Sequence, residues 1–199
     1  MLVLSLLMLA TGVRWLDPAE GKAAAVRVPA APADFPGLRL IPGAGVVQVQ
    51  LPSMRWASVT QEQDVLHGTR VRVLKGAHAL LLLDTASQVE FREKTVARVE
   101  HYRNPELGVE CWLLLQSGQL KISKEGTELY RRFLITTPWA SFSAEGERIE
   151  LLVALQGAET RAALTRGALH VETGLEDRTL RAPITFFIGD DGSLVLPGY

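Results

Sequence analysis

Cysteine is nearly absent from this chain, which holds a single one, Cys111, among its 199 residues. One cysteine cannot form an internal disulfide, and it cannot supply the thiolates of a cysteine-built zinc site. The neighbouring residues Val109, Trp112 and Leu113 are apolar, so we expect the thiol to be buried. A lone buried thiol is compatible with an oxidising compartment.

An excess of charge of one sign is also missing. The chain has 21 Lys+Arg against 22 Asp+Glu, a formal net charge of -1. Such a balance provides no broad cationic field for phosphates, so nucleic acid is not an expected partner. With 47% hydrophobic and 22% charged residues, the chain can bury a core and is not a disordered tail.

Patterns for catalysis or metal binding are lacking as well. Neither Ser87 nor Ser117 lies in a glycine-flanked nucleophile elbow. No pair of histidines has the spacing of metal ligands, and we expect each of the four to be an ordinary strand or turn residue: His67, His78, His101 and His170. We therefore predict no enzymatic activity, no cofactor and no metal.

The N-terminal apolar run is short. Arg14 interrupts it before it could cross a bilayer of about 30 Å. Its length suits the apolar part of a secretory signal, but the basic segment that normally comes first is missing. Residues 1–16 are thus interpreted as signal-like or as a truncated membrane anchor, and a buried N-terminal core helix is the alternative. Residues 17–42 are rich in proline and alanine and are predicted to be a linker.

The remainder of the chain is dominated by patterns typical of β-strands. Residues 70–73 alternate charged and apolar side chains, as a half-buried strand does, whereas residues 79–83 are continuously apolar. Candidate strands recur about every 8 to 12 residues, which is typical of an all-β protein. Their ranges are 46–51, 55–59, 69–74, 78–84, 88–92, 96–102, 110–115, 119–123, 130–136, 139–143, 147–155, 160–165 and 168–172.

From this pattern we predict short antiparallel strands that form a sandwich, a roll or a solenoid-like domain over residues 43–174. Residues 175–199 are predicted to be a C-terminal hairpin extension around an Asp-Gly turn. No sequence repeat accompanies the rhythm of strands, so the three architectures remain open.

Several motifs occur in a recognisable order. They are Trp56; Leu66 with Gly68; the basic strand Arg70 to Val73; Gly76 with Ala79 to Leu83; the acidic turn Asp84 to Ser87 with Val89 and Phe91; Leu115 to Leu120; Phe133 to Ala140; and Thr165 to Val171. Over roughly residues 43–172, these motifs resemble the extracytoplasmic domain of the FecR family, the iron-dicitrate sensor regulators. The chain departs from the family pattern at Ala86, where glycine is common, and at residues 146–149.

The resemblance implies a non-enzymatic domain that binds another envelope protein, in a periplasmic or envelope protein that is exported or membrane-anchored. In the family, the partner is the signalling domain of an outer-membrane transporter. A cytoplasmic helical segment of the family holds the sigma factor, and we find no such segment ahead of residues 1–16. The resemblance thus implies the sensor-domain architecture, and leaves sigma-factor control open.

Large aromatic rings are the best candidates for binding partners. Trp56, Trp139 and Tyr130 can anchor a protein interface where they are not committed to the core. An uncovered strand edge offers a second route, because its backbone groups can pair with an extended partner. The alternative function is a carbohydrate- or cell-wall-binding module, since tryptophans on a flat β face can stack on sugar rings.

Overall fold

The computed structural model describes residues 37–104, 108–126 and 130–197. These residues contain fifteen strands and no helix, so the prediction of an all-β protein is confirmed. The strands, in chain order, are β1 Leu38–Pro42, β2 Val47–Gln50, β3 Ala57–Val59, β4 Gln63–Val65, β5 Thr69–Val73, β6 Ala79–Leu82, β7 Gln88–Phe91, β8 Thr95–Asn104, β9 Gly108–Glu125, β10 Tyr130–Thr136, β11 Ala140–Gln156, β12 Glu159–Thr173, β13 Asp177–Arg181, β14 Ile184–Ile188 and β15 Leu194–Val195.

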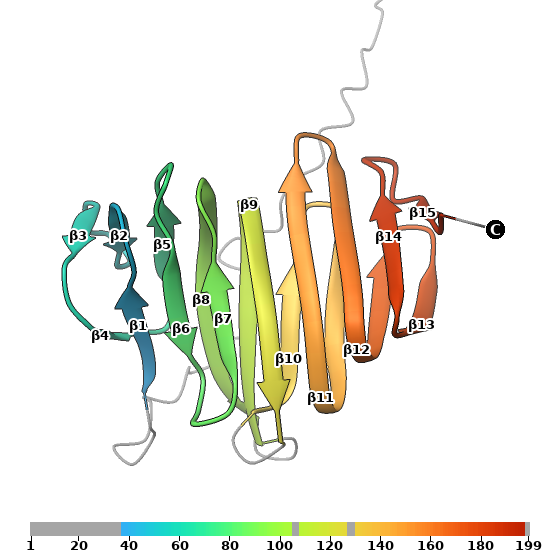
Figure 1. Ribbon diagram of the computed structural model, residues 1–199, viewed down its shortest axis with the longest axis horizontal. Helices are drawn as coiled ribbons and strands as arrows, with labels where there is room; N and C mark the ends of the chain where they lie inside the picture. Colours follow the sequence, from blue (N-terminus) through green and yellow to red (C-terminus); the bar gives the residue numbers. More distant parts are fainter. Residues whose placement is uncertain (1–36, 105–107, 127–129, 198–199) are drawn as a thin grey trace, which may run out of the picture. The chain divides into compact units, whose positions relative to one another are not determined.

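The strands form one hydrogen-bonded sheet that folds over on itself into two layers (Figure 1). Layer A runs β3-β2-β5-β8-β9-β10-β11-β12-β13, and layer B runs β4-β1-β6-β7-β9-β11-β12-β14-β15. Strands β9, β11 and β12 belong to both layers because their two halves pair with different neighbours. In β9, residues 108–117 pair with β8, whereas residues 118–125 pair with β11.

Two features of the strands differ from the predicted short antiparallel strands. Strands β9, β11 and β12 are long, with 18, 17 and 15 residues. In addition, β10 is parallel to β9, while the other pairings in the described part of the chain are antiparallel. The parallel pair arises because β9 leaves layer A after residue 117, so the chain re-enters that layer at the end where β9 began.

Three glycines lie where the long strands pass from one layer to the other. Gly118, Gly146 and Gly167 have φ angles of 87°, 103° and 94°. Residues with a Cβ rarely adopt positive φ, which makes glycine the residue that permits these bends. The sequence predicts separate strands on either side of each glycine. The structure instead has continuous strands that bend there.

Apolar side chains fill the space between the layers. Along each strand, buried apolar residues alternate with residues that point outward, as in β5, where Val71 and Val73 are fully buried. Because buried residues of neighbouring strands lie opposite each other, they form rows that run across the sheet. One row in layer B consists of Leu40, Leu81, Val89, Ile122, Leu151 and Leu164. A row in layer A consists of Cys111, Phe133, Ala144, Leu169 and Leu180.

The β-structure begins earlier than predicted and continues further. Strand β1 lies inside the predicted linker, residues 17–42, and it pairs with β4 and β6 in layer B. Its residues Leu38 and Leu40 are buried, but the surrounding prolines conceal this short apolar pattern in the sequence. The predicted extension, residues 175–199, is also part of the sheet, because β13 and β14 both pair with β12. Its expected hairpin is present as β14 and β15.

The N-terminal prediction concerns residues outside the described part of the chain. The signal-like or anchor segment, residues 1–16, and the first part of the predicted linker, residues 17–36, both fall there. Among the residues that the structure describes, none belongs to a helix that is long and apolar enough to cross a membrane.

Gly118→Ala should destabilise the protein more than Gly146→Ala. Both positions have positive φ, so each substitution should cost about 1–2 kcal/mol in backbone strain. At Gly118 the added Cβ would also lie 2.4 Å from the Thr95 Cα, whereas at Gly146 it would meet no atom within 4 Å. We expect Gly118→Ala to lower the free energy of unfolding by about 2 kcal/mol more, measured by urea denaturation. Equal losses would contradict this account of the bend.

Cys111 should make the stability of the protein depend on pH under alkaline conditions. The thiol is fully buried, as predicted, and burial raises its pKa far above the ordinary value. The unfolded thiol ionises above about pH 8.5, so the unfolded state releases a proton that the folded state keeps. Stability should therefore fall as the pH rises past that value.

Urea denaturation across this pH range checks the prediction. The loss of stability between about pH 7 and about pH 9.5 should be smaller in Cys111→Ala than in the wild type, whatever the stability of the variant at neutral pH. If the free energy of unfolding falls equally with pH in both proteins, groups other than Cys111 cause the loss of stability.

Candidate functional site

The outer surface of layer A carries a group of arginines and glutamines around Trp56. Buried residues such as Val49 and Val71 fill the inner side of β2 and β5, so their sequence neighbours point outward. The register pairs Gln48 with Arg72 and Gln50 with Arg70 across these two strands. We call this surface the Trp56 face and define it by Gln48, Gln50, Met54, Trp56, Arg70, Arg72 and Arg98.

The ring of Trp56 lies against two guanidinium groups. The Arg72 guanidinium carbon is 4.3 Å from the ring centroid, and that of Arg70 is 5.6 Å away. A guanidinium over an aromatic ring at this range is attracted by about 0.5–1 kcal/mol at an exposed site. Trp56 is half-buried in this position, just ahead of edge strand β3. The contact fixes the ring and the Arg72 side chain against each other.

Glutamine side chains hold the same two guanidiniums. Arg72 donates from Nε and Nη2 to Gln48 Oε1, at 3.0 and 2.5 Å. Arg70 donates from Nη1 to Gln50 Oε1 at 3.2 Å and from Nη2 to Gln116 Oε1 at 2.8 Å. An amide oxygen accepts these hydrogen bonds without neutralising the positive charge. In the part of the chain that the structure describes, neither arginine forms an ion pair with a carboxylate.

A small hollow adjoins these arginines. Its volume is about 290 Å³, and its lining contains arginines but no carboxylate: Gln50, Leu51, Pro52, Ser53, Gly68, Arg70 and Arg98. The Arg70 Nε atom is buried and has no hydrogen-bond partner among the described residues. The hollow is at the small end of the range for ligand sites, which favours a single side chain or a small anion.

Arg98 is positioned by a network of buried acidic and aromatic side chains on β8 and β9. Its Nε donates to Glu100 Oε1 at 2.9 Å, and the Tyr102 hydroxyl donates to the other oxygen of Glu100. Trp112 Nε1 donates to Glu110 Oε2 at 2.9 Å, and the Trp112 and Tyr102 ring centroids are 4.8 Å apart. Glu100 and Glu110 are only 6% and 5% exposed. Burial, together with the Glu100 contact, raises the pKa of Tyr102 well above its ordinary value.

The three aromatic residues predicted to bind a protein do not lie together. Trp139 is in the turn between β10 and β11, where it packs against the core, and its Nε1 is buried without a partner among the described residues. Tyr130 begins β10, which is separated from β2 by β5, β8 and β9 in layer A, and its side chain lies outside the described part. Of the two tryptophans, whose side chains the structure describes, Trp56 takes part in the group on the outer face and Trp139 does not.

Two of the four histidines lie side by side in the structure. The rings of His67 and His101 are 5.6 Å apart at a right angle, and His101 N lies 3.3 Å from His67 Nδ1. Burial and the neighbouring His67 lower the pKa of His101. The other two histidines are not part of this pair: His78 lies just ahead of β6, and His170 lies in β12. Among the described residues, no group of three or more His, Cys, Asp or Glu side chains could hold a metal ion.

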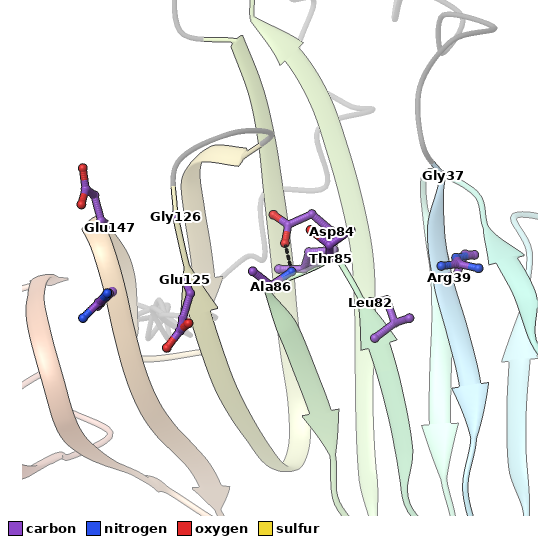
Figure 2. Close-up of a pocket in the computed structure, with 11 residues that line it drawn as sticks. Gly37, Arg39, Leu82, Asp84, Thr85, Ala86, Glu125, Gly126 and Glu147 are labelled. Carbon is purple, nitrogen blue, oxygen red and sulfur yellow. Dashed lines mark hydrogen bonds between the residues drawn. The ribbon is translucent and has the colours of Figure 1, made fainter.

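A larger hollow of about 990 Å³ lies at the end of layer B, beside the acidic turn (Figure 2). Asp84 Oδ1 accepts hydrogen bonds from Ala86 N and Ser87 N at 2.8 and 2.6 Å, which shapes this turn. Glu125 and Glu147 line the hollow from β9 and β11. Its charges are mixed, because arginines of β1 and β11 also line it. Gly37 and Gly126 complete the lining on two sides.

A buried lysine lies near two of the carboxylates that line this hollow, Asp84 and Glu147. Lys124 is 2% exposed, and its Nζ donates to Gly146 O at 2.8 Å. Burial lowers its pKa, and the nearby carboxylates of Asp84 and Glu147 act in the opposite direction. The lysine thus joins the end of β9 to the bend of β11, and its contacts are those of a structural side chain.

Arg70, Arg72 and the glutamines were not among the residues predicted to bind. The alternation of residues 70–73 does predict that the arginines point outward. Nothing in the local sequence, however, predicts that Trp56 stacks on Arg72, because the two are joined only through the folding of β2, β3 and β5.

Comparison with known proteins supports the fold. No protein-family profile and no curated protein matches the chain. Two crystal structures of a candidate anti-sigma factor from Parabacteroides distasonis ATCC 8503, at 1.65 and 2.50 Å resolution, are similar, with TM-scores of 0.52 and 0.50. The sequence identities are 15% and 14%, and each match covers 63% of this chain and 57% of the other. At this identity, and with little more than half of the other protein matched, the likeness shows the fold alone.

Tyr102→Phe should destabilise the protein and remove a tyrosine whose pKa is raised. The substitution deletes the donor to the buried Glu100 carboxylate, so we expect a loss of about 1–3 kcal/mol in the free energy of unfolding. Absorbance at alkaline pH monitors phenol ionisation. In the native wild type, one tyrosine should titrate well above about pH 10, and that phase should be missing from the variant. An identical titration in both proteins would contradict the buried network.

Proposed function

We propose that the chain is a non-enzymatic, FecR-like domain that binds another protein in envelope signalling or sigma-factor regulation. The observation that carries the proposal is the likeness of its two-layered fold to the candidate anti-sigma factor of Parabacteroides distasonis. That protein is described as a candidate anti-sigma factor, which is a regulatory class. The FecR resemblance of the sequence points to the same class of function.

The positions of the FecR-like motifs support this proposal. Gly118 lies in the motif Leu115 to Leu120, and Gly167 lies in the motif Thr165 to Val171. At both glycines a long strand bends from one layer into the other. The acidic turn is held by Asp84 through hydrogen bonds to two backbone N–H groups. Several of the FecR-like motifs thus lie at positions that shape the scaffold, which is what a FecR-like sensor domain would require of them.

The proposed domain works on the outer side of the cytoplasmic membrane. Residues 1–16 would export the chain or hold it at the membrane, and the linker would separate the domain from that segment. The partner would be an envelope protein, and the signalling domain of an outer-membrane transporter is the partner that the FecR resemblance implies. Sigma-factor control would follow from that interaction.

The described tryptophans favour a protein partner over a carbohydrate. A sugar ring stacks on an open aromatic face. Trp56 has Arg72 against its ring, Trp112 packs against Tyr102, and Trp139 packs against the core. Each of these rings is thus already engaged in a contact within the chain.

Photo-crosslinking in the envelope tests the proposed function. The full chain would carry a photoreactive amino acid at the exposed position Ser58, near Trp56, and a control protein would carry it at Glu159, at the start of β12. We expect a defined protein adduct from position 58 that the control does not form. Repeated experiments without a protein adduct from either position would contradict the proposal. Retention on cell-wall glycans that is lost in Trp56→Ala would favour the carbohydrate alternative.

A further inference from the structure

We propose that the Trp56 face is a docking site for an acidic, extended segment of the partner protein, with carboxylates of that segment bound by Arg70 and Arg72. The inference rests on the proposed protein-binding function, and it names the chemistry of the partner.

The first argument is the charge that the face leaves uncompensated. Arg98 is paired with Glu100, but the described part of the chain supplies Arg70 and Arg72 with amide oxygens only. Two positive charges are therefore held at adjacent outward positions of one strand, in a chain whose formal net charge is -1. Acidic side chains complement such a local charge.

The second argument is that the guanidiniums are already in place. Gln48, Gln50 and Gln116 hold them by hydrogen bonds, and Trp56 lies against both. A long arginine side chain normally loses rotamer freedom when it binds, and that cost is reduced where the side chain is fixed beforehand. Each guanidinium keeps N–H groups beyond those given to glutamine, and a planar fork of N–H donors matches a carboxylate.

The third argument concerns spacing. Arg70 and Arg72 are two residues apart on β5, so their outward positions are separated by about 6.5 Å. An extended peptide places every second side chain on one side, with the same separation. Carboxylates at alternate positions of a strand-like segment can thus meet both arginines at once.

Two further features favour a peptide over a membrane surface. Met54 is 61% exposed, and its carbonyl accepts a hydrogen bond at 2.8 Å from Nε2 of Gln50, whose Oε1 binds Arg70, so an exposed apolar residue is joined to the same group. A peptide can use that apolar contact, and the adjacent hollow of about 290 Å³ has room for one of its side chains. Binding to anionic lipid headgroups usually needs a cluster of about 4–8 basic residues, more than this face presents.

Peptide binding to the full chain tests the proposal. The probe is a fluorescein-labelled peptide with glutamate at every second position, and the control peptide has glutamine in place of each glutamate. We expect the acidic peptide to raise the fluorescence anisotropy, with weaker binding at higher salt, and the control peptide to have no effect.

Charge-matched variants locate the binding site. The variant with both Arg70→Gln and Arg72→Gln should weaken binding by about tenfold or more. The variant with both Arg178→Gln and Arg181→Gln changes the net charge equally on β13, at the opposite edge of layer A, and should change binding by less than about twofold. Unchanged urea midpoints would show that both variants fold. Lack of binding to the wild type, or equal losses in the two variants, would overturn the proposal.

Vesicles and crosslinking separate the remaining outcomes. If vesicles of phosphatidylcholine with phosphatidylglycerol bind through Arg70 and Arg72 more tightly than the peptide does, the face is a membrane contact and the proposal fails. If the crosslinked envelope partner is recovered equally with the wild type and the Arg70/Arg72 variant, the proposed function stands and this docking site fails. If the peptide binds through these arginines but no envelope protein is recovered, the docking site stands and the proposed function fails.

Discussion

The structure depends on three strands that cross between two layers at glycine bends. Strands β9, β11 and β12 contribute to both layers, so the backbone itself closes the core where Gly118, Gly146 and Gly167 lie. An added Cβ at Gly118 or Gly167 would come within 2.4 or 2.3 Å of a backbone atom. At these two bends the backbone of a neighbouring strand passes so close that a side chain has no room, which makes glycine the residue that the crossing requires.

This closure separates the residues that build the fold from those that are free to bind. Inward positions must be apolar and in register. Each row of buried residues passes through several strands, so a slip in one strand would turn its apolar side chains to the other face of the sheet. Outward positions carry no such constraint. The outward residues of β2 and β5 form a ladder of glutamines and arginines, while those of β8 and β9 form the buried network around Glu100 and Tyr102. The second group positions Arg98 at the margin of the Trp56 face, because Glu100 holds its guanidinium.

Sequence periodicity predicts most of this fold, because alternation reports which residues face the core. It predicts β5 from the alternation of Arg70 and Arg72 with Val71 and Val73, while the apolar neighbours of Cys111 identify that residue as part of the core. It fails at Gly118, where a glycine reads as the end of a strand although hydrogen bonding continues through the bend. It also misses β1, whose two buried leucines lie among prolines. The Trp56 face combines residues from β2, β5, β8 and the segment ahead of β3, and side-chain contacts between distant segments have no local signal.

The arginines of the Trp56 face are difficult to explain by stability alone. Arg70 and Arg72 point the same way from one strand, so their charges repel each other. A glutamate in place of Gln48 or Gln50 would pair with the arginine opposite and relieve that repulsion. Glutamine instead fixes the guanidinium and leaves its charge available, and the Trp56 ring offsets part of the cost. An arrangement that holds charge in place without neutralising it is expected where a binding partner supplies the missing carboxylates, because departures from the most stable choice concentrate at functional sites.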